Sequence, residues 1–165
     1  MKVTSMRDTG VPRTDVENDF VRARRRQVLA TLGHRLRGHP PDRDRIVPLA
    51  EVVGPLGRGG QQHLGLQTIP VQTIIGTIDP HRGFDRHFRP TTNRVRSRWQ
   101  QLALAQRRGA QIPPIDVYRV GDRHFVTDGH HRVSVAAATG QQWIDAHVTE
   151  LFTAAPPGQK LGRAA

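Results

Sequence analysis

The chain has 165 residues, a length that suits one globular domain rather than a two-domain enzyme. It carries 25 Lys and Arg against 14 Asp and Glu, a formal net charge of +11, and nearly all of the cations are arginines. A field of this sign attracts phosphate-bearing partners. The absence of cysteine excludes disulfides, thiolate metal sites, iron–sulfur clusters and a cysteine nucleophile.

The sequence also bears on localisation. It contains no apolar run close to the roughly 20 residues that a membrane-spanning helix needs. Its first residues, Met1 to Ser5, lack the apolar stretch of a secretory signal. We therefore expect a cytoplasmic protein without a membrane partner, and the sequence leaves the oligomeric state open.

Residues 1–65 are predicted to hold a basic helix and a linker arm. Thr14 and Glu17 form a capping-box signature, and apolar residues near a 3.6-residue period predict a helix over 15–36. The residues assigned to its packed face are Val16, Phe20, Val28, Leu29, Leu32 and Leu36. Its arginine-rich faces are either solvated or a nucleic-acid contact. Residues 38–65 are dense in Pro, Gly and charge and predict a linker, and the glycines at 57–60 do not fit a phosphate-binding P-loop.

Residues 66–151 are predicted to form the folded core of the chain. The fold class is α+β, a small mixed β-sheet with packed helices, to which the basic N-terminal helix is appended. The expected elements are a strand over 67–76, a helix over 93–108 capped by Thr91 or Thr92, a hairpin of 115–120 and 123–127 turning at Gly121 and Asp122, a helix over 130–138 closed by Gly140, and a strand over 143–149. Residues 152–165 are expected to form a disordered tail.

The most informative segment is the turn at residues 128–132, where a predicted strand ends and a helix begins. Backbone N–H groups and the positive end of the helix dipole collect at such a junction, and Gly129 lets an anion approach the chain. The basic side chains that follow, His130, His131 and Arg132, predict an anion-binding turn. The alternative is that Asp128 only caps the helix.

Two stretches resemble a known family. Residues 112–117, Ile-Pro-Pro-Ile-Asp-Val, and residues 128–132, Asp-Gly-His-His-Arg, are similar to segments of the ParB/sulfiredoxin fold, which includes ParB N-terminal domains, sulfiredoxins and free-serine kinases. The resemblance extends over about residues 66–151. It implies that nucleotide phosphates bind at Gly129, His130, His131 and Arg132, with Arg94 on the pocket wall. It also implies a nucleoside triphosphate, CTP or ATP, with Mg²⁺.

Departures from the family narrow the expected activity. Sulfiredoxins carry a cysteine where this chain has His130, and their thiol chemistry cannot proceed without that sulfur. No room for a helix-turn-helix region follows residue 151, so centromere reading of the ParB kind is not expected from such a motif. The resemblance therefore implies a stand-alone ParB-like nucleotide-binding protein, with DNA as a further candidate partner in the context of chromosome partitioning.

Two alternatives stay open. The first is a small-molecule kinase or a nuclease of the same fold, with Asp79, Asp85 and Asp128 as candidate catalytic carboxylates; the first two are equally well turn residues. Whether the chain is an enzyme, a nucleoside triphosphatase or kinase, is thus left open. The second is a non-catalytic nucleic-acid-binding module. For that module the contact residues are Arg82, Arg86 and Arg89, which alternate with Phe84 and Phe88. The histidines match no common metal-ligand spacing, so no metal site is predicted within the protein itself.

Overall fold

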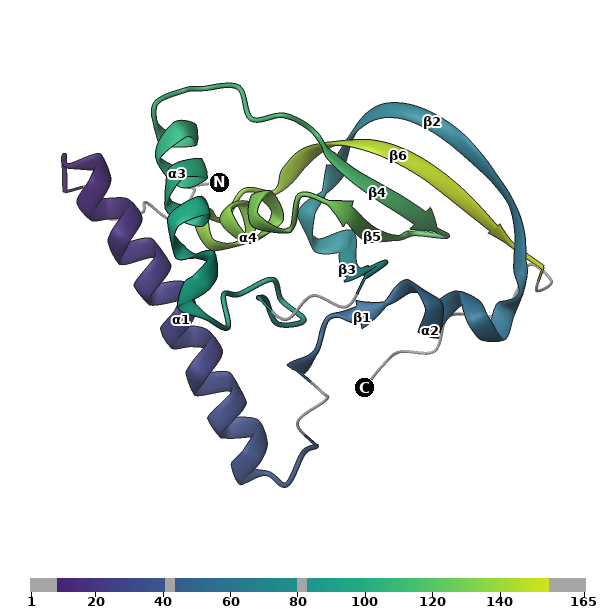
Figure 1. The fold of residues 1–165 in the computed structure, drawn as a ribbon, viewed down its shortest axis with the longest axis horizontal. Coiled ribbons are helices and arrows are strands. Elements are labelled where there is room, and N and C mark those ends of the chain that lie inside the picture. Colours follow the sequence, from purple (N-terminus) through teal and green to yellow (C-terminus); the bar gives the residue numbers. More distant parts are fainter. Residues whose placement is uncertain (1–8, 41–43, 80–82, 155–165) are drawn as a thin grey trace.

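A six-stranded mixed sheet forms the centre of the part of the chain that the computed structural model describes, residues 9–40, 44–79 and 83–154 (Figure 1). The strand order is β1-β3-β5-β4-β6-β2. The strands are β1 (Val47–Pro48), β2 (Arg58–Pro70), β3 (Ile74–Thr77), β4 (Ile115–Val120), β5 (Arg123–Asp128) and β6 (Trp143–Thr153). The helices are α1 (Pro12–Leu36), α2 (Leu49–Val53), α3 (Arg96–Arg107) and α4 (His130–Thr139). The predicted α+β class, a mixed sheet with packed helices and a basic N-terminal helix, is confirmed.

The strand directions set the position of the turn at residues 128–132. β4 and β5 form the predicted antiparallel hairpin around Gly121, whose φ of 59° fits the first position of a type II′ turn. β3 runs parallel to β5, and β6 runs parallel to β4. Because β3 and β5 are parallel neighbours, their carboxyl ends lie at the same edge of the sheet. Asp79, just after β3, and Asp128, at the end of β5, therefore share that edge.

Trp99 joins three helices in the core. Its side chain is fully buried on α3 and meets Phe20 of α1 edge to face, with 5.5 Å between the ring centroids. The indole N–H donates a 2.9 Å hydrogen bond to the hydroxyl of Ser134 on α4. Figure 1 shows α1 on the outer side of α3, with α4 on the sheet side. The start of α4 is thus held against α3, which brings residues of both helices to one site.

The N-terminal half of α1 is attached through buried carboxylates. Asp15 and Asp19 are buried where α1 meets the end of α3, and Arg107 Nη2 lies 2.6 Å from an oxygen of Asp19. Thr9 donates its N–H and its hydroxyl to Asp15 at 3.0 and 2.7 Å. These pairings replace the predicted capping box, which is wrong: the helix begins at Pro12 after Val11 and has no side-chain cap.

The predicted packed face of α1 is only half right. Val16 and Phe20 are buried, whereas the other four predicted residues are exposed: Val28, Leu29, Leu32 and Leu36. The reason is geometric. With 3.6 residues per turn, each four-residue step drifts about 40° around the axis, so the series from position 16 to position 36 turns about 200° away from the core.

The segment predicted as a linker is structured. Residues 38–65 contain β1, α2 and the first part of β2. β1 pairs in parallel with β3, Val47 opposite Gly76, and β2 runs antiparallel along β6, so strand β2 crosses the boundary expected between residues 65 and 66. The predicted strand over 67–76 is two strands, β2 and β3, separated by a 3₁₀ turn at Val71–Thr73 that follows Pro70.

The remaining predictions concern the ends of elements. A 3₁₀ turn at Asn93–Val95 precedes α3, and neither it nor α3 has a side-chain cap from a preceding threonine. Gly140 closes α4 in the left-handed conformation with φ 73°, as expected. β6 continues to Thr153, and the rest of the expected tail, residues 155–165, lies outside the described residues.

Candidate functional site

Gly129 shapes the junction between β5 and α4. Its φ is +109°, a value that side-chain-bearing residues rarely adopt, and a Cβ placed on it would lie 2.5 Å from Cγ2 of Ile115. Glycine is therefore required at this position. α4 begins directly afterwards without a side-chain cap, so the alternative in which Asp128 serves as the cap is wrong. The uncapped start and the helix dipole favour a negative group here.

The two histidines of the turn are held by neighbours. His130 Nε2 lies 2.8 Å from the hydroxyl of Thr77 on β3, and that hydroxyl donates to the carbonyl oxygen of Val126 at 3.1 Å. Because the hydroxyl hydrogen is used in this way, the ring nitrogen of His130 donates to it. The His131 ring meets Phe84 edge to face at 5.1 Å. Both rings are thus oriented by the fold.

Arg132 fastens the turn to the segment before β4. Its guanidinium donates to the carbonyl oxygens of Pro113, at 3.0 Å, and Pro114, and it pairs with the carboxylate of Asp128. Only 14% of the Arg132 side chain is exposed. Its donors are therefore largely occupied, and its role in the fold is to position the turn.

A hollow of about 360 Å³ lies at this junction and is called the turn pocket below. Its lining residues are Arg98, Leu102, Pro113, Asp128, Gly129, His130, His131 and Arg132. The four residues predicted to bind nucleotide at the turn are thus brought to one concavity. Arg94, the fifth, lies in the 3₁₀ turn before α3 and is not among the residues that line it.

Arg98 is the binding candidate that sequence reasoning missed. It is exposed on α3 and forms no hydrogen bond or ion pair with a described residue, so its guanidinium is available to a ligand. The signal in the sequence was the spacing of Arg98 and Leu102, which share a helix face at i and i+4. Which of the arginines around α3 faces the turn depends on how α3 packs on α4, and no pattern in the sequence sets that.

A second hollow, of about 210 Å³, adjoins the turn pocket. The two share Leu102, Pro113 and Arg132, and the second is also lined by Gln106 and Gln141. These two amides hydrogen-bond to each other at 2.8 Å. Because they share these lining residues, the two hollows adjoin each other, and Arg132 lines both.

The three predicted catalytic carboxylates have different environments. Asp85 is 1% exposed and accepts hydrogen bonds from the N–H groups of His87 and Arg89, both at 2.9 Å, and from Nε of Arg89 at 2.7 Å. It therefore organises its own loop. Asp79 is exposed at the sheet edge, and Asp128 lines the turn pocket. The described residues hold no group of three His, Cys, Asp or Glu side chains arranged for a metal ion.

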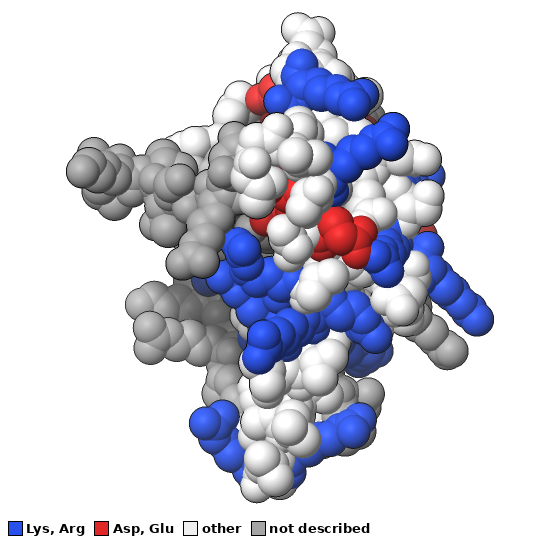
Figure 2. Space-filling view, turned by 90° about the vertical axis from the view of Figure 1, so that its left-hand side faces the viewer, with Lys and Arg blue, Asp and Glu red and all other residues white. Residues whose placement is uncertain are grey.

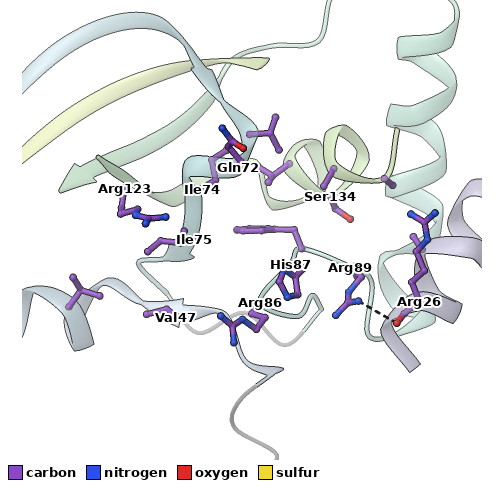
Figure 3. Close-up of a pocket in the computed structure, with 17 residues that line it drawn as sticks. Arg26, Val47, Gln72, Ile74, Ile75, Arg86, His87, Arg89, Arg123 and Ser134 are labelled. Atoms are coloured by element: carbon purple, nitrogen blue, oxygen red, sulfur yellow. Dashed lines mark hydrogen bonds between the residues drawn. The ribbon is translucent and has the colours of Figure 1, made fainter. Parts of the chain in front are cut away.

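The segment with the predicted nucleic-acid contacts Arg82, Arg86 and Arg89 is called the basic loop below. Its arginines have different environments in the structure. Arg82 lies outside the described residues, and Arg89 is bound to Asp85 and donates to the carbonyl oxygen of Arg26 at 3.3 Å. Arg86 lines a separate hollow of about 760 Å³, called the large pocket below (Figure 3). Burial, followed by the charge of Arg89, lowers the pKa of His87 in the same loop. This histidine is therefore biased toward its neutral form.

Basic side chains also gather on the face that carries α1, as Figure 2 shows. The exposed arginines of this helix are Arg13, Arg22, Arg25, Arg26, Arg35 and Arg37. Arg24 donates to the carbonyl oxygen of Pro90 at 3.3 Å, so the basic loop lies directly against α1. The arginines that the sequence placed on this helix are thus exposed on one face of the molecule.

The comparisons with known proteins find similarity among solved structures but assign no family. No protein-family model matches the chain, and no curated protein matches it. Among solved structures, sulfiredoxin from Arabidopsis thaliana is similar with a TM-score of 0.35 and 18% identity, over 50% of this chain and 82% of that one. A likeness of this size assigns neither a family nor an activity. Within the described residues, no helix has the length and apolar character required to cross a membrane.

Proposed function

We propose that the turn pocket binds the phosphates of a nucleoside triphosphate. The observation that carries this proposal is that an uncapped helix start and the unpaired guanidinium of Arg98 meet at one hollow of about 360 Å³. Backbone N–H groups and the helix dipole favour an anion at this position. A guanidinium offers the fork of donors that matches phosphate oxygens. His131 also lines this hollow.

The adjoining hollow supports a nucleotide over a small inorganic anion. Ligand sites for cofactor-sized molecules measure about 300–1,000 Å³, and the turn pocket alone is at the lower end of that range. The second hollow extends the site with apolar side chains, Leu102 and Ile144, and with the amides of Gln106 and Gln141. Apolar walls with a few polar groups suit a sugar and a base. The phosphates would then occupy the end near Gly129.

Mg²⁺ would enter this site with the nucleotide. Asp128 lines the turn pocket and its side chain is 64% exposed, so it is the residue that would approach a phosphate-bound Mg²⁺. The ion supplies neutralisation of phosphate charge. Hydrolysis or transfer to an acceptor would depend on Asp79 or Asp128, because the oxygens of Asp85 are engaged by its own loop.

Calorimetric titration with ATP, CTP and pyrophosphate, each with and without Mg²⁺, tests this proposal. We expect one site per chain and a loss of about tenfold or more in affinity for Arg98→Gln, the loss typical of one charge-assisted hydrogen bond. Arg108→Gln removes the same charge from the exposed end of α3 outside the pocket and is the matched control. Equal affinities in the two variants, or no binding by the wild type, would contradict the proposal.

A second candidate function is binding of single-stranded or double-stranded nucleic acid by the α1 face. It is favoured by the exposed arginines of α1 and by the contacts that hold the basic loop against that helix. Anisotropy of a labelled oligonucleotide should then fall steeply as salt rises, without any need for nucleotide. A combined Arg22→Gln and Arg35→Gln variant should reduce the salt slope. Binding that is insensitive to salt and to these substitutions would exclude this candidate.

A further inference from the structure

The large pocket lies apart from the turn pocket and shares no lining residue with it. Its volume is about 760 Å³. Residues of α1, β1, α2, β3, β5, α4 and the loop at 83–90 contribute to its walls. It lies between two apolar clusters, one that contains Trp99 and one that contains Phe125. The apolar surfaces on its two sides therefore face each other across a hollow.

The walls of the large pocket are mainly aliphatic. The aliphatic residues that line it are Ala23, Val47, Val52, Val71, Ile74, Ile75, Val133, Ala137 and Ala138, and Phe88 adds an aromatic ring. A surface of this kind gains free energy when a hydrocarbon replaces water. A ligand with a flexible apolar chain therefore suits these walls.

Four arginines line this apolar interior, and one of them, Arg89, is paired with Asp85. Figure 3 shows Arg123 and Arg26 at opposite ends of the pocket, with Arg86 and His87 between them. The guanidinium groups of Arg26 and Arg86 form no ion pair with a described residue, and Arg123 is paired at 3.4 Å with Asp122, which is 82% exposed. The described lining residues include no Asp or Glu. The charge around the pocket is therefore positive and attracts an anion.

The polar groups in the pocket do not suit a sugar or a nucleobase. Ser134 is buried, and its hydroxyl oxygen already accepts the indole N–H of Trp99. The other uncharged polar residues, Gln72 and His87, are at the rim, where their side chains are at least partly exposed. A ribose or a base in the interior would lose hydrogen bonds to water without replacement, which is costly. A hydrocarbon chain loses none.

We propose that the large pocket binds an amphipathic anion, with its aliphatic chain between β3 and α4 and its carboxylate or phosphate group at Arg26 or Arg86. The ligand class is an alkyl carboxylate or an alkyl phosphate, since each combines an apolar chain with one anionic group at its end. This site is separate from the proposed nucleotide site, and neither proposal depends on the other.

Calorimetric titration of the full chain with decanoate and with decyl phosphate tests the proposal, and the two ligands distinguish the two kinds of anionic group. We expect saturation at one ligand per chain. Arg26→Gln and Arg86→Gln should reduce the affinity, about tenfold in at least one of them, whereas Arg108→Gln should not. Ala137→Leu, at an exposed lining position of α4, should reduce it about tenfold or more by filling the hollow.

The outcomes separate the two sites. Binding of decanoate that survives Arg98→Gln and is not displaced by ATP supports the large pocket as its site. Absence of saturable binding overturns the proposal, as does binding that neither Ala137→Leu nor the two arginine variants weaken. Far-ultraviolet circular dichroism of each variant establishes that it is folded. If Ala137→Leu is unfolded, shifts of the Ala138 and Val133 methyl signals on adding decanoate to the wild type decide the matter, and their absence overturns the proposal.

Discussion

The loop around Asp85 and the turn around Asp128 use the same ion pair in different ways. In each, an Asp is paired with an Arg four residues later, Asp85 with Arg89 and Asp128 with Arg132. Asp85 is 1% exposed and is saturated by hydrogen bonds from its own loop, whereas Asp128 is 64% exposed and faces a pocket. An arginine in a basic segment is thus not automatically a cation available to a ligand. Among the described residues, Arg86 of the same loop as Asp85 forms no ion pair, and neither do Arg98 on α3 and Arg26 on α1.

The sharpest test of this comparison is to remove each carboxylate in turn. Asp85→Ala leaves two loop N–H groups and the Arg89 guanidinium without their acceptor, so we expect a loss of about 3–5 kcal/mol in the free energy of unfolding. Asp128→Ala should cost about 0–1 kcal/mol, because its contact is solvent-exposed. Urea denaturation measures both. Similar losses in the two variants would show that the two pairs are equivalent.

The turn itself is expected to be intolerant of any side chain at its glycine. Gly129→Ala combines the left-handed backbone with a Cβ that would contact Ile115, and we expect a loss of about 3 kcal/mol or more. Gly109→Ala is the matched control, since its φ is +76° but nothing lies within 4 Å of the added Cβ. It should cost about 1–2 kcal/mol. Thermal or urea unfolding measures both variants. Equal losses of stability would show that the contact with Ile115 contributes nothing beyond the backbone strain.

We expect the stability to depend on pH through His124, a buried histidine on β5. Burial, followed by the charge of Arg119, lowers its pKa to about 4. Its Nδ1 lies 2.8 Å from the hydroxyl of Thr73, and its buried Nε2 has no hydrogen-bond partner among the described residues. The unfolded chain therefore binds the proton more tightly, and the contribution of His124 is present near pH 7 and is lost as the pH falls toward 4.

The free energy of unfolding is therefore expected to fall by about 2 kcal/mol between about pH 7 and about pH 5 from the titration of His124 alone. His124→Asn keeps a donor near Thr73 but does not titrate, so it should flatten the curve over this range. Urea midpoints measured at a series of pH values provide the test. A variant whose pH profile is as steep as that of the wild type would assign the effect to other groups.

A small effect is also expected from changing the shape of the Arg132 cation while keeping its charge. Arg132→Lys loses the fork that bridges Pro113, Pro114 and Asp128, and should cost about 1 kcal/mol of stability. Nucleotide affinity should change less than in Arg98→Gln, because Arg132 positions the turn. If Arg132→Lys instead weakens binding more than Arg98→Gln in the same titration, Arg132 is the principal phosphate ligand.

Much of the second half of the fold could be predicted from local chemistry. The hairpin followed from Gly121 and Asp122 between two β-branched runs, and α4 followed from small residues that end at Gly140. The first third could not be predicted in the same way. β1 is two residues long and is stabilised by pairing with β3, which is distant in sequence, so its own residues carry little signal.

The candidate site shows the same limit. The turn at residues 128–132 and its concavity were foreseeable because glycine and a strand-to-helix junction are local features. The groups with which each arginine interacts could not be predicted from the sequence. That Arg132 bonds to the carbonyls of Pro113 and Pro114, and that Arg98 faces the turn, depend on how α3, α4 and the segment before β4 pack together.

Amide chemical shifts of ¹⁵N-labelled protein during titration with ATP and Mg²⁺ test the central claim most directly. We expect the largest changes at the backbone N–H groups of Gly129, His130 and His131, with smaller ones along α3 near Arg98, because the phosphates are proposed to bind at the start of α4. Changes concentrated on α1 or around Arg26 and Arg86, with the signals of the turn unmoved, would contradict the account.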